Sequence, residues 1–258
     1  MGTNVVLSFD DGRGDNYLVA KNILQEKNIP ATFNITTDYV LEKDEAYRPC
    51  VNPPMTKRQV IELSQNGLFE IAGHGKKHHN EMSNLADGLA ELQAWTHREC
   101  AGVASPNSKL AFDQVLSQKK EYHANNIHYV RLGDRFPRFA LMKRTLRKTN
   151  SVLHSKAIYQ WIYTNSFVTP EDTFVLPSIP VMNHTTVKEL VGAIENAVKK
   201  DESVIFMFHS VCRAGESFHD DPWTWDYGKF EKFCDALCGL RDGKKIQLCT
   251  TKELMKRR

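Results

Sequence analysis

The chain opens on an apolar run that ends in two adjacent carboxylates and a glycine, Val5-Val6-Leu7-Ser8-Phe9-Asp10-Asp11-Gly12. The apolar part predicts a buried strand. Successive side chains of an extended strand point in opposite directions, so both carboxylates reach one site only if the chain turns there. Gly12 permits such a turn. The end of this first strand is therefore the first part of a candidate site.

Two further apolar runs end in histidines. One is Ile71-Ala72-Gly73-His74-Gly75-Lys76-Lys77-His78, with two imidazoles four residues apart, and the other is Phe206-Met207-Phe208-His209. In α/β folds the strand ends gather around one mouth, so we expect the three motifs to form one site. A carboxylate with two histidines can hold a catalytic zinc or similar divalent ion and leave positions open for water and substrate. The remaining aspartate and histidine are then free for proton transfer.

Strand-like and helix-like runs alternate along the chain. We expect strands at 4–9, 31–35, 69–73, 100–104, 128–132, 174–181 and 204–209, and helices at 15–27, 56–66, 84–97, 110–121, 186–199 and 226–240. This alternation is typical of parallel strands joined by crossover helices. The sequence has no internal repeat and no low-complexity linker. It therefore predicts one α/β domain over residues 1–258, a barrel of roughly seven parallel strands.

The stretch 135–167 fits the alternation least well. It is rich in Arg and Lys and contains Tyr159, Trp161 and Tyr163. One interpretation is an insertion that shapes the substrate cleft, since aromatic rings stack on sugars and cations meet anionic groups. The other is a solvated helix with its aromatic side chains packed inward.

Composition is that of an ordinary enzyme domain: 258 residues, 41% hydrophobic, 25% charged, with a net charge of +3. That charge is too small to indicate nucleic-acid binding. No stretch approaches the roughly 18 apolar residues of a membrane span, and no signal-peptide pattern precedes the first strand. We expect a cytoplasmic protein, unless a signal or anchor has been removed. The six cysteines show no CxxC pair, so we expect free thiols: Cys50, Cys100, Cys212, Cys234, Cys238 and Cys249.

The segments SFDDG, His74 to His78, and FMFHSV together resemble the NodB-homology polysaccharide deacetylases, carbohydrate esterase family 4. The resemblance spans Val5 to about Leu254 and implies a distorted (β/α) barrel around a divalent metal, with Zn²⁺ expected and Co²⁺, Ni²⁺ or Mn²⁺ also compatible. It implies Asp10 as general base, His209 as general acid, and a ligand set of Asp11, His74 and His78. A shift of one residue, with His79 replacing His78, stays open.

The family's oxyanion motif is RPPY-like, and its nearest match here is Ala104-Ser105-Pro106-Asn107-Ser108. The resemblance implies the backbone N–H of Asn107 as oxyanion donor, since a backbone group survives a change of side chain. Where the family has an Arg beside the base, this chain has Ala104. Support for Asp10 must come from elsewhere, and Arg131 with Asp134 are candidates.

The predicted function is metal-dependent hydrolysis of an N-acetyl group on a sugar of a glycan or glycan precursor. Trp223, Trp225 and Arg131 are candidate substrate-binding residues, although core or rim packing explains the tryptophans equally well. Three alternatives stay open: an amidase for a non-sugar amide or cyclic imide, an O-deacetylase, and a catalytically silent carbohydrate-binding relative. Cleft shape decides between the enzymes.

Overall fold

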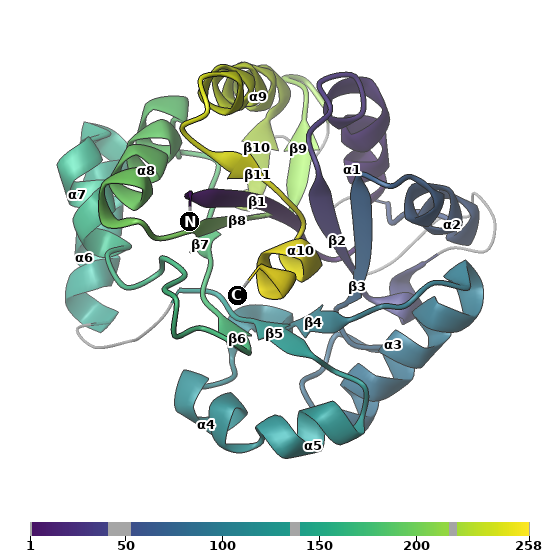
Figure 1. The fold of residues 1–258 in the computed structure, drawn as a ribbon. Coiled ribbons are helices and arrows are strands. Elements are labelled where there is room, and N and C mark those ends of the chain that lie inside the picture. The colour runs from purple at the N-terminus through teal and green to yellow at the C-terminus, as the bar shows by residue number, and fades with distance from the viewer. Residues whose placement is uncertain (1, 41–52, 135–139, 217–220, 258) are drawn as a thin grey trace.

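Parallel strands form one curled sheet with helices packed around its outside (Figure 1). The computed structural model describes residues 2–40, 53–134, 140–216 and 221–257. The strand order is β6-β5-β4-β3-β2-β1-β8-β7, with β11 also paired to β1, and every pairing in the sheet is parallel. The predicted distorted (β/α) barrel is therefore confirmed, as a half-barrel with surrounding helices.

The strands of this sheet are β1 (Asn4–Phe9), β2 (Ala31–Ile35), β3 (Phe69–Gly73), β4 (Gly102–Ala104), β5 (Tyr129–Arg131), β6 (Val175–Leu176), β7 (Ile179–Pro180), β8 (Val204–Phe208) and β11 (Gln247–Leu248). A separate parallel pair consists of β9 (Ser210–Cys212) and β10 (Thr224–Asp226).

The α-helices are α1 (Gly14–Val19), α2 (Lys57–Gln65), α3 (Met82–Thr96), α4 (Phe112–Ser117), α5 (Lys119–Ala124), α6 (Ala140–Leu153), α7 (Lys156–Ile162), α8 (Val187–Lys200), α9 (Tyr227–Asp242) and α10 (Thr251–Lys256). A π-helical turn, η1 (Ala20–Leu24), extends α1, and short 3₁₀ turns occur at η2 (Thr37–Tyr39) and η3 (Pro106–Ser108).

The barrel does not close between β6 and β7. The run 174–181, predicted as one strand, is two short strands separated by Pro177 and Ser178. β6 pairs with β5 and β7 pairs with β8, so this segment switches neighbours along its length. Pro177 has no N–H for a ladder and marks the switch. Seven predicted strand regions thus become eight strands, and β11 is added near the closing segment that the family resemblance covers.

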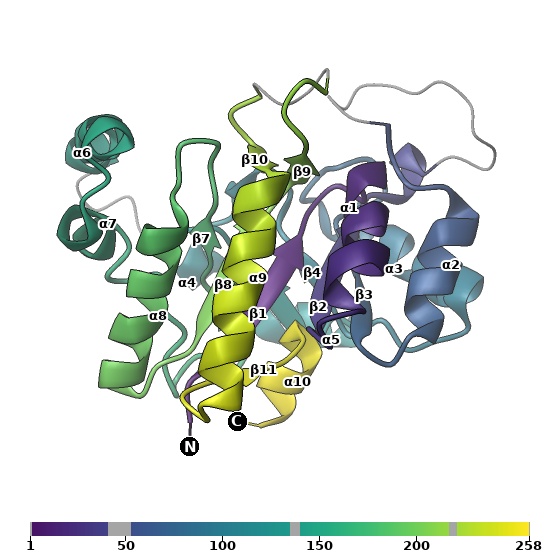
Figure 2. The same ribbon diagram turned by 90° about the horizontal axis from the view of Figure 1, so that it is seen from above.

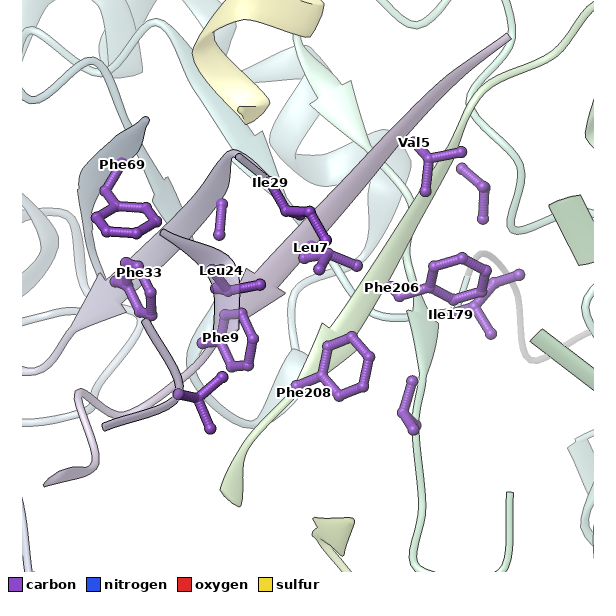
Figure 3. Close-up of a cluster of buried hydrophobic side chains, with 14 of the residues drawn as sticks. Val5, Leu7, Phe9, Leu24, Ile29, Phe33, Phe69, Ile179, Phe206 and Phe208 are labelled. Atoms are coloured by element: carbon purple, nitrogen blue, oxygen red, sulfur yellow. The ribbon is translucent and has the colours of Figure 1, made fainter. Parts of the chain in front are cut away.

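The two faces of the sheet carry different chemistry because side chains alternate along each strand. Phe9, Phe33, Phe206 and Phe208 lie in the large hydrophobic layer between the strands and the helices (Figure 3). Their sequence neighbours point inside the barrel. There Val6 and Ile205 form a smaller apolar cluster with Leu254 of α10, which lies across one end of the ring of strands (Figure 1).

The predicted insertion is partly described: residues 135–139 lie outside the described part, and the rest forms α6 and α7. A cleft-shaping role, like the single-domain assignment, stays a prediction. Among the described helices, none has the length and apolar character needed to cross a membrane. The five cysteines that the structure describes are free thiols, and Cys50 lies outside the described residues.

Candidate metal centre and catalytic site

The chain turns at the end of β1, as the pair of carboxylates requires. Asp10 continues the ladder, because its N–H donates to the carbonyl of Phe208 at 2.9 Å. Asp11 has a φ of 73° and Gly12 a φ of 69°. This left-handed turn lets the Asp11 side chain reach the inside of the barrel, where Asp10 already points. Both carboxylates are buried.

Three ligand atoms converge beside this turn. The Nε2 atoms of His74 and His78 lie 3.2 Å apart, and each lies 3.4 Å from Oδ1 of Asp11. Atoms that bind a tetrahedral zinc at about 2.05 Å are separated from one another by roughly 3.3 Å. The donor set therefore fits a divalent ion in spacing and in kind. Within the described residues it is the one such cluster found.

The tautomer of His74 supports this assignment. Its Nδ1 lies 3.0 Å from the carbonyl oxygen of Ala104, which can only accept, so Nδ1 carries a proton. In the neutral ring Nε2 then presents a lone pair to the cluster. Burial disfavours charge on His74, but the carboxylates of Asp10 and Asp11 outweigh it and raise its pKa. Burial and the charge on His74 lower the pKa of His78 to about 4.

Arg13 fixes the carboxylate of Asp11, a role that the sequence did not lead us to predict. Its Nε and Nη2 donate to Oδ2 of Asp11 at 3.1 and 2.9 Å, and its Nη1 donates to Ser210 Oγ at 2.9 Å. Burial opposes ionisation of Asp11, but hydrogen bonding with His74 and the charges of His209 and Arg13 hold its pKa well below the usual value. The fork occupies Oδ2 and leaves Oδ1 beside the two histidine Nε2 atoms, where a divalent ion would be held. The sequence signal that could have indicated this role is Arg13 itself, a cation two residues after Asp11.

Arg131 supplies the cation that the oxyanion motif lacks. It comes from β5, is almost fully buried, and hydrogen-bonds Oδ1 of Asp10 through Nη2. Asn34 on β2 donates to the same oxygen at 2.8 Å. Burial favours the neutral acid, but the charge of Arg131 outweighs it, so the pKa of Asp10 is lowered. Within the described residues both bonds use Oδ1, which leaves Oδ2 to accept a proton. Asp134 pairs with other cations.

His209 follows β8 and lines the same cavity as Asp10 and the three ligands. Its ring lies against Trp223, with centroids 4.6 Å apart. Burial lowers the pKa of His209, against the pull of both carboxylates. Its buried Nδ1 has no hydrogen-bond partner among the described residues.

The cavity around these groups has a volume of about 380 Å³. Asn107 and Trp223 are exposed side chains in its lining. Tyr39 also lines it, with its ring centroid 5.9 Å from that of His78. Asn107 has a φ of 54°, in the turn after β4. Its role as oxyanion donor stays a prediction.

Two candidate substrate contacts lie away from this surface. Trp225 has no exposed area, and its Nε1 donates to the carbonyl of Thr185 at 2.8 Å. It packs in the core, and Arg131 lies behind Asp10. His79 is 63% exposed and lies 3.7 Å from Glu81, so the structure places His78 in the ligand cluster.

Comparison with known proteins bears on the family and the fold. Residues 2–121 match the family model described as polysaccharide deacetylase. A family 4 acetyl xylan esterase from Clostridium thermocellum, solved with a cobalt ion, has a TM-score of 0.53 at 16% identity, covering 98% of this chain and 91% of that one. At that identity the likeness shows the fold.

Two further structures match part of the chain. The BpsB deacetylase domain from Bordetella bronchiseptica has a TM-score of 0.41 at 16% identity, covering 49% of this chain and 62% of that one. A de-N-acetylase from Aggregatibacter actinomycetemcomitans has a TM-score of 0.40 at 19% identity, covering 50% of this chain and 62% of that one. The aligned part is less than two thirds of each. Curated protein sequences give no match. The family match over residues 2–121 and the shared fold confirm the resemblance to the NodB-homology polysaccharide deacetylases.

Proposed function

We propose that the chain is a metal-dependent N-deacetylase that acts on a sugar of a glycan or glycan precursor. The observation that carries this proposal is the convergence of Asp11, His74 and His78 in a cavity that Asp10 and His209 also line. The donor types suit zinc, and the other divalent ions expected from the sequence suit them as well. A divalent ion held there would polarise the acyl oxygen and acidify an attacking water.

The chain's own residues account for the proton transfers. Asp10, kept ionised by Arg131, accepts a proton from the water as its oxygen attacks the acetyl carbon. The N–H of Asn107 donates to the developing oxyanion. His209 gives a proton to the leaving nitrogen as the C–N bond breaks, which yields acetate and a free amine.

The silent carbohydrate-binding alternative was motivated by the Arg missing at Ala104. Arg131, on the strand next to the one that ends at Ala104, supplies a cation that hydrogen-bonds Asp10. The missing Arg is therefore no longer a reason to expect a silent protein. The amidase and O-deacetylase alternatives differ in substrate and use the same groups. They are outcomes of the test below.

The test is acetate release from N-acetylated oligosaccharides and sugar nucleotides by metal-stripped protein, with and without added Zn²⁺ or Co²⁺. We expect release that depends on the metal. The Asp10→Asn variant should bind metal normally and lose on the order of 10²–10⁴ of the rate, because the base is gone. Full activity of this variant, or a lack of release by the metal-loaded parent, would refute the proposal.

A further inference from the structure

Helix α6 turns much of its apolar face to the outside and a polar face toward the rest of the protein. Its exposed side chains include Leu141 and Val152, each 78% exposed, with Leu153 at 61%. Lys143 and Asn150 are instead buried against the rest of the protein. Burying apolar surface is the main favourable term in folding, so a helix normally packs in the opposite orientation. The inward polar face requires an explanation of its own.

That polar face lines a second cavity, of about 630 Å³, which contains Lys143, Arg147 and Asp134 in its wall. Ser108, Met207 and Trp223 line both this cavity and the metal cavity. The two cavities therefore adjoin, so a substrate with its acetamido group at the candidate metal centre has room to extend into the second one.

The second cavity has an excess of positive charge along its α6 wall. Lys143 Nζ lies 3.4 and 3.3 Å from the two carboxylate oxygens of Asp134, and Arg147 Nη2 lies 2.6 Å from Oδ2. Ser166 also hydrogen-bonds this carboxylate. Two cations and one hydroxyl thus share the single carboxylate of Asp134. The Lys109 and Asp113 side chains on the same cavity offset each other in charge.

Both cations keep unused hydrogen-bonding capacity. The contacts of Lys143 are long for an ammonium, which has three donors, and within the described residues Asp134 is its one acceptor. Arg147 Nε is buried with no partner among those residues. Lys143 is buried, and a buried cation that is incompletely paired is costly, so a role in the stability of α6 alone does not explain its position. The Arg147 side chain is 39% exposed and lies over the ring of Tyr163, so it is accessible from the cavity.

We propose that this cavity is a subsite for an oxyanion carried by the sugar substrate, a phosphate or a carboxylate, with Lys143 and Arg147 as its ligands. The inference rests on the proposed deacetylase function and adds the substrate class: an anionic N-acetylated sugar. A phosphate group is a feature of activated sugar precursors, and a carboxylate of acidic sugars, so the test includes both.

Equilibrium binding separates this inference from the catalytic one. By calorimetry, we expect N-acetylglucosamine 1-phosphate to bind the metal-loaded protein roughly 10- to 100-fold more tightly than N-acetylglucosamine, as hydrogen bonds to charged groups allow. N-acetylmuramic acid, with its carboxylate, is the second arm. The preferred anion is the one that binds more tightly. Equal binding of the neutral and both anionic sugars overturns the subsite, whether or not acetate is released.

Variants locate the effect. Lys143→Met and Arg147→Lys should reduce the ratio of anionic to neutral binding, and Arg144→Gln, an exposed cation on the same helix, should leave the ratio unchanged. In the parent protein, raising the salt concentration should weaken the binding of the anionic sugar and leave the binding of the neutral sugar unchanged. The salt dependence is measured on the parent protein, so it tests the subsite even if Lys143→Met does not fold. A ratio that is the same in parent and in both folded subsite variants overturns the assignment.

The outward face of α6 carries a second, independent inference. Leu141, Met142, Val152 and Leu153 are exposed along it, and the helix contains four basic and no acidic residues. The exposed cations Arg144 and Lys148 flank this apolar stripe. An apolar face bordered by cations is the pattern of helices that lie in the interface of anionic membranes.

We infer that α6 docks the protein on an anionic membrane surface. Figure 2 shows α6 at the same end of the molecule as β9 and β10, which follow the catalytic His209. Docking there would bring the site close to membrane-borne substrates.

The test is sedimentation with phosphatidylcholine vesicles, with and without phosphatidylglycerol. We expect binding only to the anionic vesicles, and the double variant Val152→Ser/Leu153→Ser should bind at least roughly 10-fold more weakly. Leu116→Ser, an exposed leucine on α4, is the matched control. Parent binding that the double variant retains overturns the inference. So does a dimer in sedimentation velocity that this variant dissociates, because a second copy would then cover the face.

Discussion

At the scale of single residues, two arginines control the two carboxylates of the turn after β1. Arg13 fixes Asp11 through Oδ2, and Arg131 holds Asp10 through Oδ1. Each aspartate is thereby given one free oxygen and a different task. The proposed function assigns these adjacent, chemically identical groups the roles of ligand and base, and their different partners account for the difference.

Replacing Arg131 should impair both stability and catalysis. In Arg131→Met the buried carboxylate of Asp10 loses its counter-ion, and we expect a loss on the order of 3–5 kcal/mol in the free energy of unfolding. The pKa of Asp10 should rise, so kcat/KM near neutrality should fall about 100-fold and the acid limb of the pH–rate profile should move to higher pH. Urea unfolding and the profile measure these effects, with Arg144→Met as control.

The sign of the pH dependence follows from the lowered pKa of Asp10. A carboxyl whose folded pKa lies below its unfolded value of about 3.9 stabilises the fold at higher pH, and that contribution is lost as the pH falls through the folded pKa. An unchanged acid limb in Arg131→Met would contradict the pairing.

Replacing Arg13 should affect the metal more than the fold. Arg13→Gln removes the fork that orients Asp11, and outer partners of this kind change metal affinity by about 10- to 100-fold. Titration against a competing chelator measures the affinity, with Lys21→Gln, a half-exposed surface lysine, as control. Equal affinity in Arg13→Gln and the parent would show that the fork does not act on the metal.

At the scale of elements, alternation along the strands explains how a hydrophobic barrel acquires a polar interior. Ser8 of β1 and Asp10, just after this strand, both accept from Asn34 of β2, at 2.8 Å each. Deeper in the barrel, Glu70 of β3 accepts from Tyr129 of β5 at 2.7 Å. The catalytic layer therefore rests on a second polar layer beneath it.

That lower layer gives a pH-dependent prediction. Burial raises the pKa of Glu70 despite bonds from the Lys252 N–H, Tyr129 and Thr32. A raised folded pKa means that this group costs stability as the pH rises from the usual Glu range through the folded pKa. Glu70→Gln removes the charge; its amide oxygen can accept from Thr32 and the Lys252 N–H while its NH2 donates to the Tyr129 oxygen. The free energy of unfolding of this variant should therefore fall less than that of the parent between pH 5 and 8 in urea unfolding. If stability fell equally with pH in Glu70→Gln and in the parent, the raised pKa of Glu70 would be contradicted.

The element scale also shows what sequence patterns can predict. The ends of β1, β3 and β8 placed Asp10, His74 and His209 correctly because a buried parallel strand is recognisable from its apolar run. The partner of Asp10 was ambiguous, because pairing across strands depends on register, and register is a property of the folded sheet. The orientation of α6 was beyond reach, since its amphipathic pattern predicts the apolar face inward.

At the scale of the whole molecule, the site joins distant parts of the chain. Asp11 follows the first strand, His74 and His78 follow the third, and His209 follows β8. A ligand that binds this site only in the folded state must therefore stabilise the whole fold. The short loop that turns at Asp11 cannot hold the metal alone.

Metal binding should accordingly raise the melting temperature. Zn²⁺ at about 100 times its Kd contributes about 2.7 kcal/mol, which for a chain of this size is roughly 5–10 °C. Calorimetry of stripped and reloaded protein measures the shift. His78→Gln should lose most of it, because a neutral amide replaces one of three ligands that lie 3.2–3.4 Å apart. His79→Gln, one residue away and exposed, should keep it. The reverse result would move the ligand to His79 and require a different path for the chain after β3.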